Sequence, residues 1–493
     1  MSEYRRDVRE AELSEPLSSK SSVDQRDSPL TMPEPSGLIE FVSQLGMAMS
    51  AAGESVSSIQ GSLAKIAQAY GTDAQIAVLP NILLVKSGER EVSEVGLASG
   101  VVNPLRLDQT AEVFELARLA KRAEISPLEG LKRLDEILRG APRYGAAARI
   151  LGYALVAVGI GLILEGSFSQ LVTCILLGVL IGELKELCAG NRTAEALVPV
   201  VAALLVGMIV FSIVKADLVT GPLMLLIPPV VTFLPGAMLT TAMLELANGD
   251  VISGSSRLVA GAIQLLLLVF GFIVAAQITG LPTAEAFAQA PRPLFAWWAA
   301  WIGVLIYGVG NYVHHSAPKH SLPWLLVVLY VAFAGQQLGN QTVGGYLSGF
   351  VGAVAMTPVA YWIQRRPGAP PAQVTFLPGF WLLVPGSLGL IGLTQFAADN
   401  RQSALETVGN MTLAIVAVAL GVMVGVSLVR PIGQQLGKLH NSTERSVGRL
   451  IGKTLVVFRK TSDAARSEID RSRTEPVETG SPGDDDPSAR ESA

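Results

Sequence analysis

The hexapeptide VTFLPG occurs twice in this chain, at residues 231–236 and again at residues 374–379. Each copy lies in a strongly apolar stretch and has a proline three residues upstream, in PPVVTFLPG (228–236) and PAQVTFLPG (371–379). Proline removes a helix hydrogen bond and glycine loosens the backbone, so each copy predicts an interruption of a helix. Two identical interruptions indicate that the chain contains two related halves.

The composition is typical of a membrane protein. Half of the 493 residues are hydrophobic, only 16% are charged, and the mean hydropathy is +0.45. Soluble chains carry about a quarter of charged residues. The middle of the chain contains many runs of the ~20 apolar residues that cross a bilayer. These features predict a mainly α-helical, polytopic membrane protein, and the net charge of −4 gives no indication of a nucleic-acid partner.

Apolar segments divide the middle of the chain into two halves. Ten segments are predicted to span the membrane: 146–164, 168–188, 196–214, 222–247, 257–279, 294–313, 321–338, 343–363, 372–396 and 407–429. The repeated hexapeptide lies on the fourth and the ninth. The chain therefore reads as two five-helix repeats, 146–279 and 294–429. Because five is odd, the second repeat must cross the membrane upside down, which predicts an inverted repeat of the kind found in secondary transporters.

The two ends of the chain have a different character. Residues 1–35 lack an apolar core, so they read as a disordered tail and not as a secretory signal peptide. Residues 36–140 alternate helix-period and short β-rich segments, which predicts a small soluble α+β domain. Residues 430–493 form a basic and then acidic tail.

Lysine and arginine set the orientation. With the N-terminus inside, they collect in the inner loops, and the outer loops hold only Lys215, Arg292 and Arg401. Since cytoplasmic loops are enriched in these residues, both termini and the 36–140 domain are predicted to be cytoplasmic.

Interrupted helices expose backbone groups that can bind a carboxylate or an ammonium group. An amino acid carries both. The substrate-binding candidates are the polar and helix-breaking residues in and after the two copies: Thr232, Pro235, Gly236, Thr240, Thr241, Thr375, Pro378, Gly379, Pro385 and Gly386. For each threonine, a hydrogen bond back to its own helix is the alternative.

Four charged residues are candidates for a gate or for proton coupling. Glu245, Asp250 and Arg257 are predicted at the cytoplasmic end of the fourth segment, where a Glu–Arg pair could open and close. Glu183 is the deepest acidic residue of the second segment, with a surface ion cluster that includes Lys185 as the alternative. The histidines of YVHHSAPKH (312–320) read as residues of an interfacial loop.

Several stretches resemble the threonine/serine exporter family. They are LPGAMLTTAMLELANGDVISGSSRLVAG (234–261), AAGES (51–55), AQIAVLPNILLV (74–85) and ISPLEGLKRLDEI (125–137). The resemblance covers roughly residues 38–430. It implies a bacterial inner-membrane exporter of L-threonine and L-serine that is powered by the proton-motive force. It also implies that relatives exist with the two halves on separate chains, and that some of those are linked to dicarboxylate export.

The expected partners are therefore an amino-acid substrate, protons and membrane lipid, with a homo-oligomer left open. No cofactor, metal or catalytic residue is predicted. The chain shows no Gly-x-Ser-x-Gly motif in its N-terminal region and no P-loop. A dicarboxylate exporter of the same fold, a hydrolase whose chemistry lies in residues 36–140, and a channel remain as alternatives.

Overall fold

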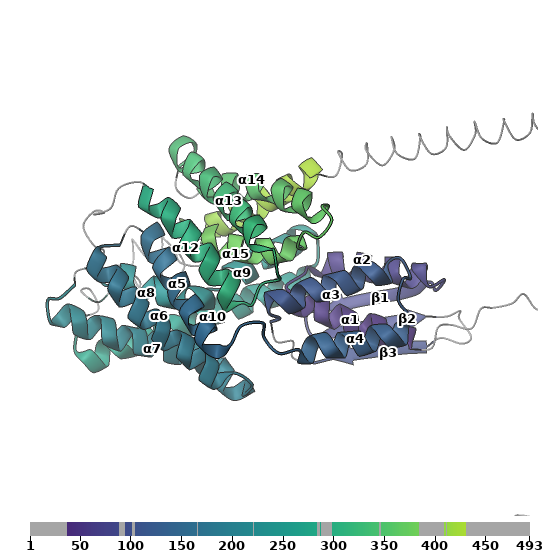
Figure 1. Cartoon of the computed structure of the whole chain (residues 1–493), viewed down its shortest axis with the longest axis horizontal. Coiled ribbons are helices and arrows are strands. Elements are labelled where there is room, and N and C mark those ends of the chain that lie inside the picture. The colour runs from purple at the N-terminus through teal and green to yellow at the C-terminus, as the bar shows by residue number, and fades with distance from the viewer. Residues whose placement is uncertain are drawn as a thin grey trace, which may run out of the picture.

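The structure is a computed structural model of the whole chain. It describes residues 37–87, 94–100, 104–164, 166–219, 221–282, 286, 298–344, 347–383, 409–410 and 412–429. These residues are mainly helical and form two parts that lie side by side, a bundle of long helices and a smaller domain that contains all the described strands (Figure 1).

The N-terminal domain contains one antiparallel sheet and four helices, of which the first two pack on the sheet and the other two pack on the first helix. The elements are α1 (Leu38–Ala51), α2 (Val56–Ala69), β1 (Ala74–Leu79), β2 (Ile82–Ser87), β3 (Glu94–Ser99), α3 (Leu107–Ala120) and α4 (Pro127–Arg139), with strand order β1-β2-β3. The core of the domain gathers apolar side chains such as Phe41, Leu45 and Leu63, none of which is exposed. Strand β3 was not predicted from the sequence.

The described helices of the bundle overlap each of the ten predicted segments, with bounds that differ from the predicted ones. These helices are α5 (Ala146–Ile163), α6 (Phe168–Cys188), α7 (Arg192–Lys215), α8 (Leu223–Val230) with η1 (Val231–Phe233) and α9 (Gly236–Ala247), α10 (Val251–Thr279), α12 (Trp298–His314), α13 (Leu322–Thr342), α14 (Ser348–Gln364), α15 (Ala372–Leu383) and the helix Thr412–Val429. Within the described ranges, five helices are long and apolar enough to cross a membrane, or six if the bent pair around η1 is one span. The prediction of a polytopic membrane protein is confirmed at this level.

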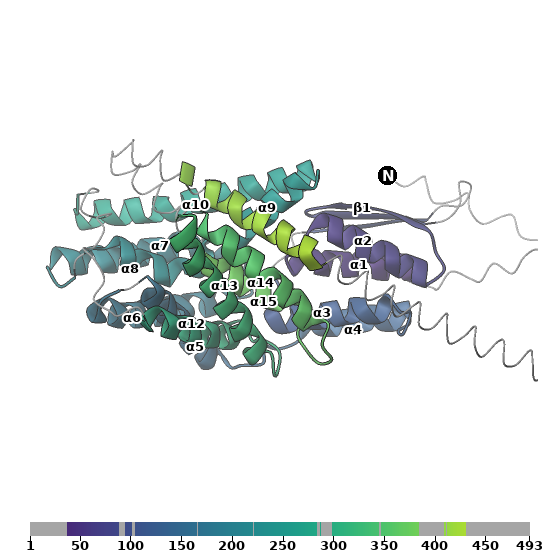
Figure 2. The ribbon, with the colours of Figure 1, turned by 90° about the horizontal axis from the view of Figure 1, so that it is seen from above.

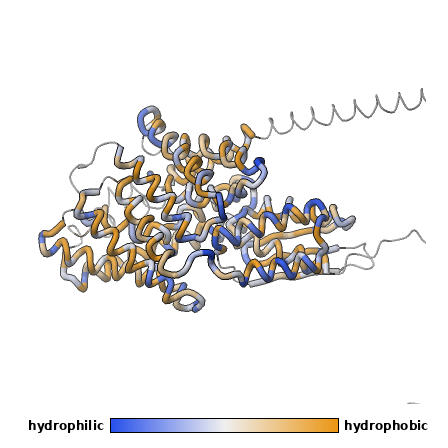
Figure 3. Tube along the Cα trace, viewed as in Figure 1, coloured by the Kyte–Doolittle hydropathy of each residue, from blue (hydrophilic) through white to orange (hydrophobic). Residues whose placement is uncertain are grey.

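The outward faces of the long helices are apolar. Leu176 on α6 is 67% exposed and Phe270 on α10 is 59% exposed. Apolar residues predominate along the bundle helices, whereas polar residues are frequent on the helices of the N-terminal domain (Figure 3). A surface of this kind is stable against lipid and would be costly in water.

The two VTFLPG copies have different structures. The first lies at a break, where α8 ends, η1 makes one short 3₁₀ turn, and α9 begins at Gly236 with a bend of 59°. The second copy lies inside α15, which runs through Pro378 to Leu383. The predicted helix interruption is therefore correct at residues 231–236 and wrong at residues 374–379. A proline in a membrane helix is tolerated where neighbouring groups satisfy the freed backbone.

The first helices of the two predicted halves, α5 and α12, run antiparallel in backbone contact. A Cβ atom on Gly159 would lie 2.5 Å from the Tyr307 nitrogen, and one on Gly152 would lie 2.7 Å from the His314 nitrogen. On the other helix, a Cβ on Gly310 would lie 2.6 Å from the Val156 nitrogen. Small residues permit such approach between membrane helices. An antiparallel pair of first helices is what an inverted repeat requires, and the repeat itself stays a prediction.

Candidate functional site

A chain of hydrogen bonds satisfies the backbone at the break between α8 and α9. The Tyr153 hydroxyl donates to the Pro229 carbonyl over 2.8 Å and lies 3.0 Å from the Thr232 hydroxyl. Because Tyr153 has one hydroxyl proton and gives it to Pro229, the Thr232 hydroxyl donates to Tyr153. The Gln264 side chain on α10 donates to the Phe233 carbonyl over 2.6 Å. Side chains thus replace the helix hydrogen bonds that the break removes.

Lys185 continues this chain from α6. Its Nζ lies 3.4 Å from Thr232 Oγ1 and 3.1 Å from His314 Nε2, and it lies over the rings of Tyr153 and Phe233 at 5.0 and 5.4 Å. The His314 Nδ1 lies 3.0 Å from the Arg149 carbonyl, which can only accept. The proton of His314 is therefore on Nδ1, and Nε2 accepts from Lys185. We call Lys185, Thr232, Tyr153 and His314 the lysine cluster.

The lysine cluster lies near one end of the bundle. Lys185 is three residues from Cys188, the last residue of α6, and His314 is the last residue of α12. The next residue, His315, accepts a backbone hydrogen bond from Leu107 of the N-terminal domain over 3.1 Å. The cluster therefore lies at the end of the bundle that faces the N-terminal domain.

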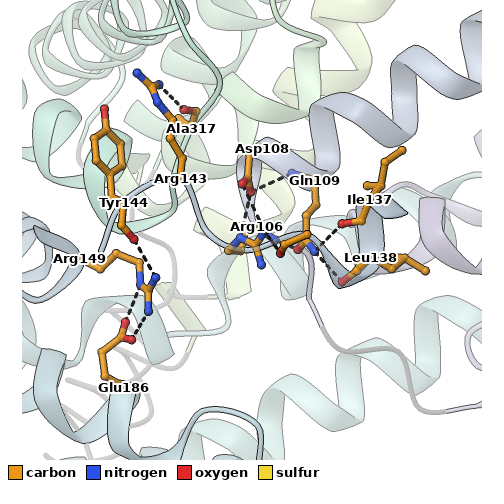
Figure 4. Close-up of polar contacts among 11 residues, drawn as sticks. Arg106, Asp108, Gln109, Ile137, Leu138, Arg143, Tyr144, Arg149, Glu186 and Ala317 are labelled. Carbon is orange, nitrogen blue, oxygen red and sulfur yellow. Dashed lines mark hydrogen bonds and ion pairs between the residues drawn. The ribbon is translucent and has the colours of Figure 1, made fainter. Parts of the chain in front are cut away.

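Arg149 and Glu186 form an ion pair beside the lysine cluster. The Arg149 guanidinium donates to both carboxylate oxygens of Glu186 and to the Tyr144 carbonyl (Figure 4). This geometry is bidentate and the two side chains are only 17% and 19% exposed. Nearby, Arg143 donates to the Ala317 carbonyl over 3.1 Å, which fixes the segment between α4 and α5 to the bundle (Figure 4).

The second VTFLPG copy is also held by a tyrosine. The Tyr307 hydroxyl on α12 donates to the Pro378 carbonyl over 2.9 Å. Thr375 donates back to the Ala372 carbonyl of its own helix over 2.9 Å, and Gly379 lies against Met356. Thr375 therefore matches the alternative expected from the sequence, in which a threonine hydroxyl bonds back to its own helix.

A second polar cluster joins the N-terminal domain to the bundle. Glu245 on α9 is 0% exposed and forms an ion pair with Arg257 on α10 at 3.1 Å. The other Glu245 oxygen accepts a hydrogen bond from the Val56 backbone at the start of α2 over 3.2 Å. We call Glu245, Arg257 and Val56, with Glu54 and Gln373 described next, the docking cluster. The predicted Glu–Arg pair is present, and the N-terminal domain takes part in it.

Glu54 extends the docking cluster to α15. The Gln373 side chain, next to the second VTFLPG copy, donates to the Glu54 carboxylate, and Arg257 donates to the Glu54 carbonyl over 3.4 Å. Burial of Glu54 raises the pKa of its carboxyl, against the lowering effects of Ser58, Gln373 and Lys121. The segment AAGES (51–55) therefore contacts α10 and α15 together. Figure 2 shows the N-terminal domain at one end of the bundle, in line with these contacts.

The remaining predicted site residues lie in different surroundings. Thr240 is fully buried and its hydroxyl has no hydrogen-bond partner among the described residues, whereas Thr241 is half-buried. Pro235 is buried against Gly261 of α10. Asp250 precedes α10, and Glu183 is exposed on α6, away from the lysine cluster. Pro385 and Gly386 lie outside the described residues.

Sequence reasoning missed most of the lysine cluster. It assigned Lys185 to a surface ion cluster and His314 to an interfacial loop, and it did not single out Tyr153. The structure shows that Glu186 instead pairs with Arg149, so Lys185 is free to turn inward. The available signal was the spacing on α6, because Gly178, Gly182 and Lys185 share the helix face that packs on α5.

Comparisons with known proteins find a distant similarity to a membrane protein. Over 358 residues the chain is 24% identical to "Pheromone-regulated membrane protein 10" of Yarrowia lipolytica. The aligned region covers 67% of this chain and 28% of that relative, so the chain spans less than a third of the relative's length. No solved structure gives a significant match to the chain.

A family match covers the N-terminal domain and the first five predicted membrane segments. The matching family is described as "Putative threonine/serine exporter", and the match extends over residues 40–279. These residues contain both VTFLPG at 231–236 and the Glu245–Arg257 pair. Residues 40–279 of the chain are therefore similar to the threonine/serine exporter family.

Proposed function

We propose that this protein is a secondary active exporter of L-threonine and L-serine, driven by the proton-motive force. The observation that carries the proposal is the broken helix α8–η1–α9, on which polar side chains from α5, α6 and α10 converge. Interrupted helices inside a bundle are where secondary transporters bind their substrates. The family match and the similarity to a membrane protein support export across a membrane.

Buried acceptors without partners support a small polar solute. Among the described residues, Thr240 Oγ1 on α9, Asn311 Oδ1 on α12 and Gln373 Oε1 on α15 are buried and make no hydrogen bond. A buried polar atom of this kind costs free energy until it finds a partner. The hydroxyl and ammonium groups of threonine or serine are donors that suit such acceptors.

The docking cluster is the proposed inner gate. Glu245 and Arg257 connect α9 to α10, and the segment 51–55 connects both of them to α15. A solute that enters from the side of the N-terminal domain would have to pass between these helices. The orientation expected from the loop charges places this domain and both termini in the cytoplasm, and the proposed site is the bacterial inner membrane. In this role the protein transports its solute without changing it chemically.

Counterflow into proteoliposomes tests the function. Purified protein is reconstituted with unlabelled L-threonine inside, and uptake of labelled L-threonine or L-serine is measured. We expect the wild type to exchange both amino acids and Thr232→Val to do so at least about tenfold more slowly, because a hydrogen bond to a charged group is lost. Thr342→Val is the matched control, since Thr342 is exposed at the end of α13 and donates only to Leu338 of its own helix.

Other outcomes would change the proposal. Counterflow of succinate without counterflow of threonine or serine would replace the amino-acid exporter with the dicarboxylate exporter. Transport that is abolished by a proton ionophore and is indifferent to sodium would support proton coupling. Transport that requires sodium would overturn it.

A further inference from the structure

Lys185 is a half-buried cation on α6 that forms no ion pair with a carboxylate among the described residues. The neighbouring acid, Glu186, is already held by Arg149 in a bidentate pair. The other contacts of Lys185 Nζ are the Thr232 hydroxyl, the unprotonated Nε2 of His314, and the rings of Tyr153 and Phe233. One positive charge is therefore left over in the lysine cluster.

An unbalanced ammonium group in such a place is costly. Buried charges in proteins are paired, because removing one from water without a counter-charge is strongly unfavourable. Within membrane proteins, an ionisable residue of this kind marks a path for a substrate or an ion. Here the tyrosine and phenylalanine rings and the back-bonded histidine hold Lys185 in place and offer it no negative charge.

The lysine also keeps one hydrogen-bond donor. An ammonium group has three N–H bonds, and Lys185 directs two of them to His314 Nε2 and Thr232 Oγ1. Thr232 belongs to the broken helix, and α9 begins four residues later at Gly236. The start of a helix adds a partial positive charge and free N–H groups, which favour an anion.

We infer that the lysine cluster binds the carboxylate of the transported solute, with Lys185 as its counter-charge. The inference rests on the proposed transport function and narrows its substrate class. A single unbalanced cation matches a solute with one carboxylate, such as a zwitterionic amino acid. A dicarboxylate would need a second cation, and Arg149 is already occupied by Glu186 and by the Tyr144 carbonyl.

The first test changes the ligand and leaves the protein intact. Binding of L-threonine and of L-threoninol, which has a hydroxymethyl group in place of the carboxylate, is measured by calorimetry on the full-length protein in detergent. We expect L-threonine to bind about 10- to 100-fold more tightly than L-threoninol, the range for a hydrogen bond to a charged group. Equal binding of the two compounds would overturn the inference.

The second test changes Lys185. In the Lys185→Met protein we expect L-threonine affinity to fall to that of L-threoninol, whose own affinity should change little. The Lys185→Arg protein keeps the charge and should retain part of the preference. Lys319→Met is the matched control, because Lys319 is exposed in the loop after α12 and makes no described contact with the cluster. A Lys185→Met protein that still prefers L-threonine would contradict the proposal.

The outcomes separate this inference from the proposed function. If threonine is exchanged and discrimination does not depend on Lys185, the exporter stands and the carboxylate site is wrong. If the wild type binds neither threonine nor serine, but binds another monocarboxylate such as lactate in a way that Lys185→Met abolishes, the carboxylate site stands and the amino-acid substrate is wrong. Binding of succinate would contradict the selectivity of the site for one carboxylate.

Discussion

The carboxylate of Glu245 accepts a hydrogen bond from the backbone N–H of Val56, 3.2 Å away and 189 positions earlier in the chain. Val56 is the first residue of α2, so this carboxylate lies at the positive end of that helix, where an acidic group is favoured. The half of the broken helix that carries Glu245 is thus attached to the N-terminal domain. A displacement of α9 has to break this contact or move the domain with it.

Removing Arg257 should destabilise the protein strongly. Arg257→Met leaves Glu245 fully buried without its counter-charge, which costs about 3–5 kcal/mol of unfolding free energy. The double variant Arg257→Met, Glu245→Met removes the buried charge and should cost less, about 1–3 kcal/mol, because the Val56 N–H loses its acceptor. Thermal and denaturant unfolding of the purified proteins measures the difference. Arg139→Met, which breaks the exposed pair with Asp135, is the control and should cost about 1 kcal/mol at most. Equal losses of unfolding free energy in Arg257→Met and Arg139→Met would contradict a buried Glu245–Arg257 pair.

Removing the Tyr153 hydroxyl should impair both stability and transport. Tyr153→Phe leaves the buried Pro229 carbonyl without its donor, at a cost of about 1–3 kcal/mol, and releases Thr232 from its acceptor. Tyr330→Phe is the control for transport, because the Tyr330 hydroxyl bonds the Trp301 carbonyl and touches neither VTFLPG copy. Counterflow corrected for the amount of folded protein is the measurement. An equal loss of transport in Tyr153→Phe and Tyr330→Phe would contradict a specific role of the Tyr153 hydroxyl in transport.

Docking of the N-terminal domain should weaken as the pH rises. The pKa of Glu54 is raised by burial above its usual 4.5, so the docked state favours the protonated carboxyl. The contribution to docking is complete below 4.5 and is lost as the pH rises through the higher pKa of the docked state. Hydrogen exchange of the α2 amides, corrected for the intrinsic effect of pH, reports the docking.

The groups that face Glu54 define the control for this pH dependence. They are Ser58 and Lys121 of its own domain, and Arg257 and Gln373 of the bundle. Glu54→Gln should weaken the pH dependence of the exchange, whereas Glu40→Gln, on the exposed side of α1, should leave the dependence intact. A pH dependence that is the same in Glu54→Gln as in the wild type would assign it to another group.

Filling the contact between α5 and α12 should disrupt the bundle. In Gly159→Ala the new methyl group would lie 2.5 Å from the Tyr307 backbone nitrogen, so the helices must separate, and we expect a loss of at least about 1–3 kcal/mol. Gly145→Ala, at the start of α5, meets nothing within 4 Å and serves as the control. The measurement is the midpoint of thermal unfolding. A midpoint unchanged in Gly159→Ala would show that the two helices are not in backbone contact.

The sequence was sufficient to predict a mainly helical, polytopic membrane protein because periodicity and hydropathy are local properties. The apolar helices follow from runs of apolar residues, and the break at 231–236 follows from Pro235 and Gly236. The same hexapeptide gave no break in α15, since the outcome depends on which groups surround the backbone. The sheet also contains β3, which the sequence did not single out, because its pairing with β2 depends on contacts beyond its own residues.

The candidate site was less accessible to sequence reasoning. The Glu245–Arg257 pair could be predicted because both residues lie close together in the chain. Glu54 and Gln373 are 319 positions apart, and Lys185 and His314 are 129 apart, so only the folded structure brings them together. Lys185 is followed directly by the acidic Glu186, and such a neighbour in sequence suggests an ion pair at the surface. In the structure Arg149 pairs with Glu186, so that suggestion does not hold.

The glycine contact between α5 and α12 also bears on whether such a protein could be encoded as two separate polypeptides. The contact joins the two halves through space, at Gly152, Gly159 and Gly310, and owes nothing to the peptide that connects α10 with α12. A gene divided between Thr279 and Trp298 would encode two polypeptides that together carry every residue of this contact. We therefore expect the two halves to associate through α5 and α12 even when no peptide joins them.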